Sequence, residues 1–264
     1  MAIYGINTIN EMYNNSNEIF SFSEIFESVI IETNDVIREL NGYRTSLQEA
    51  TDEESKKSII NKIIDALKKI KEIFIRTITK IKNVITTKLQ KISINKLKNS
   101  LKGVSIEPGK VDCYGVKINE LYNDILQCIS FSDDGATTIS DLDAKKDQLN
   151  KIQDNFVKDY TIRREMSYTD AYSLCRIADE VITLYSKMID KQNKLMNDVD
   201  KRIRKTIDKL NKMNRNPLEH DDEILDRMDQ QIRILKLAIN VIARINIDMN
   251  ELNNGVFSVI GNYV

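Results

Sequence analysis

Residues 51–101 read TDEESKKSIINKIIDALKKIKEIFIRTITKIKNVITTKLQKISINKLKNSL, and their spacing of apolar residues predicts one long amphipathic helix. Thr51 and Glu54 stand in the T-x-x-E relation of a capping box, so we expect the helix to begin there and to end at Gly103. The β-branched run 73–87 also suits a strand, which makes it the place where the helix competes with another structure. The predicted buried face consists of Ile60, Ile63, Ile64, Leu67, Ile70, Phe74, Ile78, Ile81, Ile85, Leu89 and Ile92.

Basic charge is concentrated in this same segment. Residues 54–102 contain fourteen Lys or Arg against three acids, an excess of eleven positive charges, whereas residues 1–53 contain two basic and ten acidic residues. The chain as a whole has a formal net charge of −1. We therefore weigh two interpretations of the basic helix: an internal match with the acidic helix before it, and a surface for an anionic partner.

The candidate contacts for such a partner are the cations of the helix. Phosphates of a nucleic acid would contact residues 56–102 without sequence preference, because the segment holds one Phe, one Arg and neither Tyr nor Trp for base stacking or bidentate base contacts. An anionic lipid surface is the other candidate. The residues are Lys68, Lys69, Lys71, Arg76, Lys80, Lys82, Lys88 and Lys91, with Lys96 and Lys98 beyond them.

The composition predicts an all-α fold. With 41% hydrophobic and 30% charged residues but only 8 Gly, 2 Pro and no Trp in 264 residues, the chain is poor in turn formers and typical of long helices. We expect an elongated helical bundle, with a long antiparallel coiled-coil-like hairpin in the C-terminal half.

Four segments divide the chain. Residues 1–20 are polar and Asn-rich and predict a flexible arm, while 21–103 combine an acidic helix with the long basic helix. The acidic helix is expected to start after Ser23 and to stop at Asn41-Gly42. Residues 104–115 contain Pro108-Gly109 and predict a turn-rich linker, after which 116–264 form a second helical module.

The second module opens with a short helix over 116–129 and another that starts at Ser140 with Asp143. Apolar residues then recur at steps of three and four from 171 to 213, with only Gln192 and Thr206 polar, which is a heptad seam. Pro217 interrupts it, and a return helix follows from Asp221 or Asp222. We expect a hairpin of 166–213 with 221–253, and an apolar tail that docks on the protein or a neighbouring subunit.

No catalytic, cofactor-binding or metal-binding residue is predicted. His220 is the one histidine and is interpreted as part of a capped turn, and the cysteines at 113, 128 and 175 as small buried hydrophobes. The acidic pairs 133–134 and 141–143 lack the spacing of a calcium loop and are interpreted as helix caps. No phosphate-binding glycine loop occurs either. We therefore expect a protein that is not an enzyme.

The acidic segment SFSEIFESVIIETNDVI, the linker TDEESKK and the run IINKIIDALKKIKEIFIRTITKIKNVI together resemble the opening of helical virion structural proteins of large tailed bacteriophages. The resemblance covers about residues 20–90. It implies a non-enzymatic component of a phage particle, inside the capsid or at the head-tail region and present in many copies. It implies no functional residue.

Two hypotheses follow for function. The first is a structural or assembly protein of a virus particle that contacts itself or other virion proteins, with packaged DNA as a further partner of the basic helix. The second is a membrane-surface-acting helical protein, toxin-like or lipid-remodelling, that uses the same helix. The N-terminal residues lack the pattern of a secretory signal and no apolar run spans a bilayer, so we expect neither classical export nor a membrane span. The resemblance implies the virion and, before assembly, the cytoplasm of the bacterial host.

Overall fold

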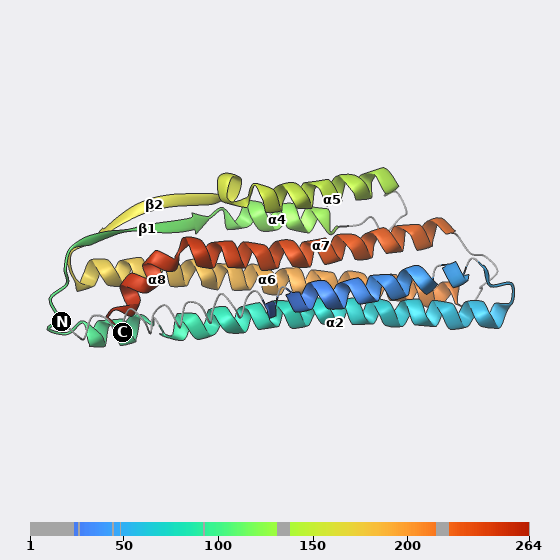
Figure 1. Ribbon diagram of the computed structural model, residues 1–264, viewed down its shortest axis with the longest axis horizontal. Helices are drawn as coiled ribbons and strands as arrows, with labels where there is room; N and C mark the ends of the chain where they lie inside the picture. The colour runs from blue at the N-terminus through green and yellow to red at the C-terminus, as the bar shows by residue number, and fades with distance from the viewer. Residues whose placement is uncertain are drawn as a thin grey trace.

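The computed structural model describes residues 24–25, 27–43, 45–47, 49–91, 93–130, 138–214 and 222–263. It is an elongated, mostly helical bundle whose long helices follow one axis, with a two-stranded ribbon and a helical pair along one side (Figure 1). Helical turns within 24–49, called the N-terminal helix below, come first. The later elements are α2 (Glu53–Lys91), α3 (Ile94–Ser100), β1 (Gly109–Val116), α4 (Ile118–Cys128), α5 (Ile139–Asp154), the π-helical turn η1 (Phe156–Tyr160), β2 (Thr161–Tyr168), α6 (Ala171–Met213), α7 (Asp222–Leu252) and α8 (Asn254–Gly261).

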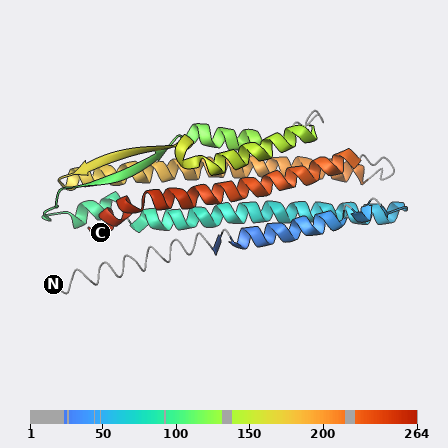
Figure 2. The ribbon, with the colours of Figure 1, turned by 45° about the horizontal axis from the view of Figure 1, so that its top comes forward.

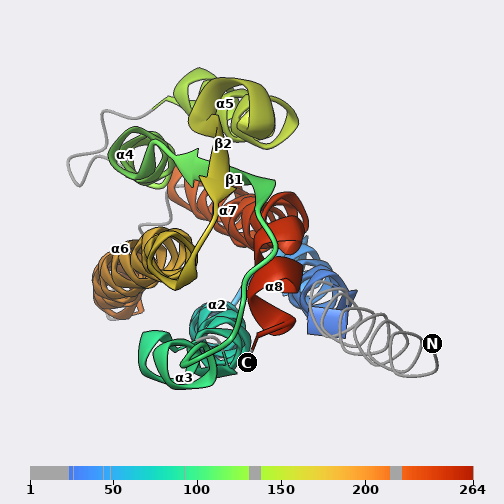
Figure 3. The same ribbon diagram turned by 90° about the vertical axis from the view of Figure 1, so that its left-hand side faces the viewer.

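The bundle has three layers. The N-terminal helix and α2 form one side, α6 and α7 form the middle, and α4, α5 and the ribbon form the other side (Figure 2). Among the labelled helices, the closest approaches are α2 with α6 and α5 with α7, followed by α2 with α7. Viewed along the axis, the helices surround one continuous apolar core (Figure 3). Residues of both predicted modules therefore share that core.

The long helix predicted over residues 51–101 is confirmed along most of its length. Its predicted face is buried from Ile60 to Ile85, with Leu89 half-buried at the far end. The β-branched run stays helical because its apolar face, with Phe74, Ile78 and Ile81, is buried in the core. The Thr77 and Thr79 hydroxyls donate to carbonyls one turn earlier, at 2.7 and 2.8 Å, and so are satisfied within the helix.

The ends of this helix differ from the prediction. Asp52, not Thr51, caps its start, since Asp52 Oδ1 accepts from the Ser55 amide at 2.7 Å. The helix ends at Lys91, because Ser93 caps the separate helix α3, which leads to Gly103 at φ +75°. At the first end, two adjacent residues, Thr51 and Asp52, are both suited to cap the helix.

Two further helix boundaries differ from the predicted ones. The N-terminal helix continues beyond the predicted stop at Asn41-Gly42, where the Thr45 and Ser46 hydroxyls donate to the carbonyls of residues 41 and 42. Helix α5 is capped by the box of Thr138 with Asp141, two residues before the predicted Ser140 and Asp143.

The predicted linker at 104–115 is wrong from Gly109 onward. Residues 109–116 form β1, which pairs antiparallel with β2 from Gly109 opposite Tyr168 to Val116 opposite Thr161. Val111, Cys113 and Met166 are buried on the inner face of the ribbon, which explains why these residues form strands. The strand β2 also takes the start of the predicted hairpin, so α6 begins at Ala171 instead of 166, capped by Asp170.

Helices α6 and α7 run antiparallel, as expected, but each has more extensive backbone contact with another helix than with the other. Side chains join them: the Tyr185 hydroxyl donates to the Met249 carbonyl at 2.9 Å, and Gln192 donates to Asn246 at 3.0 Å. The coiled-coil-like hairpin therefore stays a prediction. The apolar tail docks on the protein itself as α8, which buries Val256, Phe257 and Ile260.

Candidate functional site: the basic face of α2

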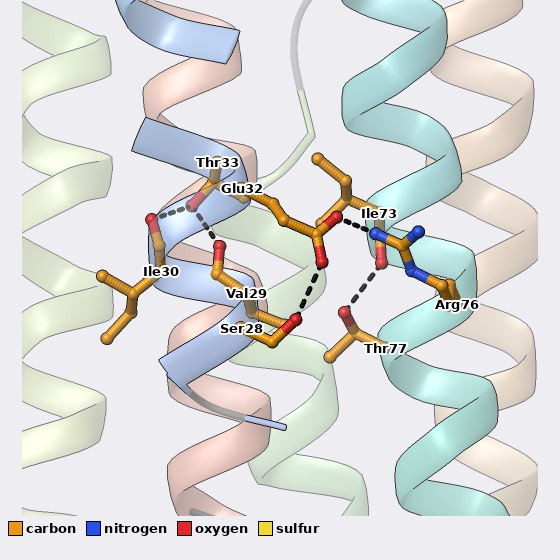
Figure 4. Close-up of polar contacts among 8 residues, drawn as sticks. All are labelled: Ser28, Val29, Ile30, Glu32, Thr33, Ile73, Arg76 and Thr77. Carbon is orange, nitrogen blue, oxygen red and sulfur yellow. Dashed lines mark hydrogen bonds and ion pairs between the residues drawn. The ribbon is translucent and has the colours of Figure 1, made fainter. Parts of the chain in front are cut away.

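The most regular contact of the basic face is an antiparallel charge match with the N-terminal helix. Lys69 Nζ lies 2.9 Å from Glu39 Oε2. Seven residues further along α2, the Arg76 guanidinium meets the Glu32 carboxylate (Figure 4). The Ser28 hydroxyl donates to the other oxygen of Glu32 at 2.8 Å and orients that carboxylate. Positions seven residues apart share one face of a helix, so the two pairs define a single register between the helices.

The same stripe extends one heptad earlier. Lys62 Nζ lies 5.8 Å from the ring centroid of Tyr43, a cation–π distance. The hydrogen bond and charge of Glu39 raise the pKa of Lys69 above its ordinary value, so this cation stays charged at neutral pH. Part of the basic excess of α2 is thus matched inside the protein, as the first of the two interpretations expects.

Lys71 points the other way, toward α6. Its Nζ lies 3.2 Å from Asp200, which also accepts from Arg204 at 2.7 Å. Burial of the Asp200 carboxyl raises its pKa, but the bonds from Lys71 and Arg204 outweigh burial, and the pKa lies below the ordinary value. Lys71 is therefore an internal link between the two longest helices.

The remaining candidates divide by exposure. Lys68 pairs with Asp65 of its own helix at 2.9 Å, and both side chains are exposed. Lys80 is exposed and Lys82 is half-buried. Lys91 is the last residue of α2, and its side chain is not among those that the structure describes.

Lys88 is buried in the protein interior, with 8% of its surface exposed. Its ammonium group donates to Asn250 Oδ1 at 2.6 Å and lies 4.0 Å from the ring centroid of Phe257. These two residues come from α7 and α8, so Lys88 ties α2 to the C-terminal end of the chain. It is the candidate that the structure removes most clearly from any outside surface.

Exposed basic residues gather instead at the end of this face. In α3 and just after it, Lys96, Lys98 and Lys102 are all exposed, and Lys80 lies earlier on α2. Lys96 and Lys98 belong to the sequence-predicted set, although the long-helix prediction placed them on the same helix as Lys68. The break at Ser93 gives them a helix of their own.

A buried polar cluster joins α4, α6 and α7, and sequence reasoning missed it. Gln192 Nε2 donates to the Tyr122 hydroxyl at 2.9 Å and to Asn246 Oδ1 at 3.0 Å, with all three side chains buried. Directly after α7, at the N-cap of α8, Asn253 donates to the Tyr114 carbonyl at 3.1 Å and accepts from the Tyr114 amide at 2.9 Å. The only signal in the sequence was Gln192 inside an apolar seam.

The cysteines are buried, as expected, and burial raises the pKa of each thiol. For Cys128 it rises to about 11, and for Cys113 and Cys175 the direction is the same. Raised thiol pKa values make these groups poor nucleophiles at neutral pH.

An acidic cleft lies between α5 and α7. Asp154, Asp248 and Glu251 line it together with Arg244, which pairs with Asp248 at 2.9 Å. Burial, and the charge of Glu251, raise the pKa of Asp248 against the effect of Arg244. Within the described ranges, no group of three or more His, Cys, Asp or Glu is arranged to hold a metal ion.

The predicted caps are confirmed in part. Asp141 caps α5, and Asp143 pairs with Lys146 on the surface at 2.9 Å. His220 and the acidic pair 133–134 lie outside the described residues. Of the helices in the described part of the chain, none has the length and apolar character needed to cross a membrane.

Comparison of the chain with protein-family models, with curated proteins and with solved structures finds no match.

Proposed function

We propose that the chain is a non-enzymatic structural or assembly protein of a bacteriophage particle, present in many copies and in contact with other virion proteins. The observation that supports this role is the rod formed by α2 and α6, which contain 39 and 43 residues. At 1.5 Å per residue each is about 60 Å long. Helices of this length, cross-linked by buried polar contacts, hold the two ends of a subunit at a fixed separation.

Within this role, α6 and α7 act as a coiled-coil-like hairpin. The heptad seam of α6 is largely buried, from Cys175 to Leu210, and Ile232 to Met249 of α7 are buried at the same spacing. In a particle the hairpin would present its outer, charged faces to neighbouring subunits.

The exposed lysines at the end of the basic face are the contact for packaged DNA. Lys80, Lys96, Lys98 and Lys102 are exposed, whereas Lys69, Lys71 and Arg76 contact carboxylates of other helices. Contact of such lysines with phosphates is sequence-independent and weakens steeply with salt.

Peptide mass spectrometry of particles purified by density gradient from cells that make this chain tests the role. We expect the chain to sediment with the major capsid or tail proteins in many copies per particle. Its absence from intact particles that contain all other virion proteins would refute the role.

A filter-binding titration with duplex DNA tests the surface. Reversal of Lys96, Lys98 and Lys102 to Glu should weaken binding and flatten its salt dependence. The matched control reverses Lys69, Lys71 and Arg76 to Glu, which should reduce stability or assembly but leave binding unchanged. Equal loss of binding in both variants would contradict the division between internal and external cations.

The membrane-surface alternative would need the apolar stripe of α2. Ile60, Ile70, Phe74 and Ile81 are fully buried against the other helices, so the bundle would have to open before this stripe met lipid. Flotation with anionic liposomes at low salt measures this directly, and binding there would favour the alternative.

A further inference from the structure

The ribbon of β1 and β2 has one open edge. Among the described residues its two strands pair only with each other, without a bulge, and the main contacts of β2 outside the ribbon are with α6 beneath it and with η1 at its start. The ribbon lies along the outside of the bundle, with β1 on the side of α7 and α8 (Figure 1). A strand with unpaired backbone groups along one side is a template for another strand.

The other edge of the ribbon, that of β1, is contacted by α7 and α8 and is blocked at Tyr114. Tyr114 of β1 points its amide and carbonyl away from β2, and the Asn253 side chain bonds both of them. An asparagine amide offers one donor and one acceptor, so it replaces a neighbouring strand at this position. The free edge of the sheet is therefore that of β2.

The phase of the ladder identifies which residues of β2 face outward. Because Tyr114, opposite Arg163, bonds outward, the pairs at odd positions of β1 carry the hydrogen bonds, and the bond from the Lys117 amide to the Tyr160 carbonyl agrees. Residues 161, 163, 165 and 167 of β2 thus direct their N–H and C=O groups to the open side.

These positions are self-complementary in charge. If two β2 strands pair antiparallel about an axis at residue 164, Arg163 stands opposite Glu165 of the second copy, and both positions have outward backbone groups. Within one chain, Arg163 bonds Asp112 and Lys110 bonds Glu165, each at 2.7 Å. Across four strands the charges on the solvent face would then alternate in sign.

Exposed apolar side chains flank the same strand. Ile162 on its inner face is 41% exposed, Val157 before it 47% and Tyr172 after it 80%. The same register places Ile162 opposite Met166 of the second copy. It also brings the strand end that carries Tyr172 beside the end that follows Val157.

We propose that two copies of this chain associate through the open edge of β2, antiparallel about a two-fold axis at residue 164, to form one four-stranded sheet. Each outward-facing pair exchanges two backbone hydrogen bonds. Self-pairing of the ribbon is a property of the isolated chain and stands apart from the particle role proposed above.

Arg164 is the one residue that this register opposes to its own copy. Its side chain is 63% exposed on the inner face, 4.0 Å from Glu180 of α6. The two guanidinium groups would meet at the axis, each beside its own Glu180, and like charges directly opposite weaken a strand pair. Arg164 therefore limits the affinity.

Cross-linking tests the register. In the background Cys113→Ala, which removes the thiol opposite position 164 in the same chain, Arg164→Cys should form a disulfide-linked dimer under mild oxidation. The matched control Ser167→Cys should not, because residues 167 of the two copies would lie about 20 Å apart. Dimers from Ser167→Cys, or none from Arg164→Cys, would overturn the proposed pairing.

Sedimentation equilibrium of the otherwise native chain tests the energetics. Arg163→Glu should weaken the dimer about tenfold, and Arg164→Thr should strengthen it about tenfold. The control Asp112→Asn removes the partner of Arg163 within the chain but faces no residue of the second copy, so it should leave the dimer unchanged. A chain that stays monomeric even as Arg164→Thr, with its helical circular dichroism intact, would refute the proposal.

Discussion

Gln192 interrupts the apolar seam of α6, and its burial restricts that seam to one register. Its amide nitrogen reaches Tyr122 and Asn246, whereas Gln192 Oε1 is buried without a partner among the described side chains. A shift of α6 by one turn would leave all three groups unpaired, which costs more than the equivalent apolar mismatch. The sequence showed Gln192 as an exception but could not identify its partners, which lie 54 and 70 residues away.

Substitutions in this cluster should lower the free energy of unfolding by different amounts. Gln192→Leu leaves the Tyr122 hydroxyl and Asn246 Oδ1 buried without this donor and should lower the free energy of unfolding by about 2–4 kcal/mol. Tyr122→Phe keeps the Gln192–Asn246 bond and should lower it by about 1 kcal/mol. Urea denaturation measures both. A smaller loss for Gln192→Leu than for Tyr122→Phe would contradict the central place of the amide.

Alkaline pH should also act through Tyr122. Burial raises the pKa of its phenol above the ordinary value of 10.0, against the effect of the hydrogen bond from Gln192. The unfolded chain then releases this proton first, so the stability contribution is complete below about pH 10 and falls as pH rises further. The slope of unfolding free energy against pH above 10 should be shallower in Tyr122→Phe. Tyr172→Phe, an exposed control, should keep the native slope.

At the scale of elements, the pattern of apolar residues predicted the long helices because a 3.6-residue period repeats many times over 39 or 43 residues. The ribbon was missed for two reasons. β2 reads TIRREMSY, with Arg164 between Ile162 and Met166 on its inner face, so its alternation is weak. Its partner β1 is about fifty residues away, and a strand pair is stabilised by contacts that no local window contains.

The sequence predicted that the net charges of the N-terminal helix and α2 would balance. It did not predict which residues pair, because the pairs depend on how the two helices pack. Glu32→Arg should reduce stability, and the exchange Glu32→Arg with Arg76→Glu should restore most of the loss. Because the pair is exposed, we expect a coupling free energy of about 0.5–1 kcal/mol from a double-mutant cycle at low salt. A coupling near zero at low salt would mean that packing alone, through residues such as Val29 and Val36, holds this helix.

At the scale of the whole molecule, two features of the sequence are enough to predict one elongated helical bundle. Gly and Pro are scarce, and apolar residues recur at helical spacing over two long segments. The arrangement of the helices depends on more, because α6 and α7, neighbours in sequence, each pack closest on another helix. Short connections favour contact between sequence neighbours, whereas here α6 packs mainly on α2 and α7 mainly on α5.

Small-angle X-ray scattering measures this shape. A compact globule of 264 residues has a radius of gyration of about 18 Å. Helices about 60 Å long in one bundle require a larger value and a distance distribution with an extended tail. Measurements at low concentration, and with Arg163→Glu, separate the single chain from any association. A radius near 18 Å would exclude the side-by-side packing of α2 and α6 along one axis.

Asn253 affects how many chains can associate through the edges of the ribbon. A two-stranded sheet with both edges open could add strands without end, as fibrils do. Here the Asn253 amide occupies the edge of β1 at Tyr114, and α7 and α8 contact the same strand, so a second strand is hindered there once two chains have joined at β2. One side chain at the middle of an edge would thus help to convert an open-ended polymer into an assembly of finite size.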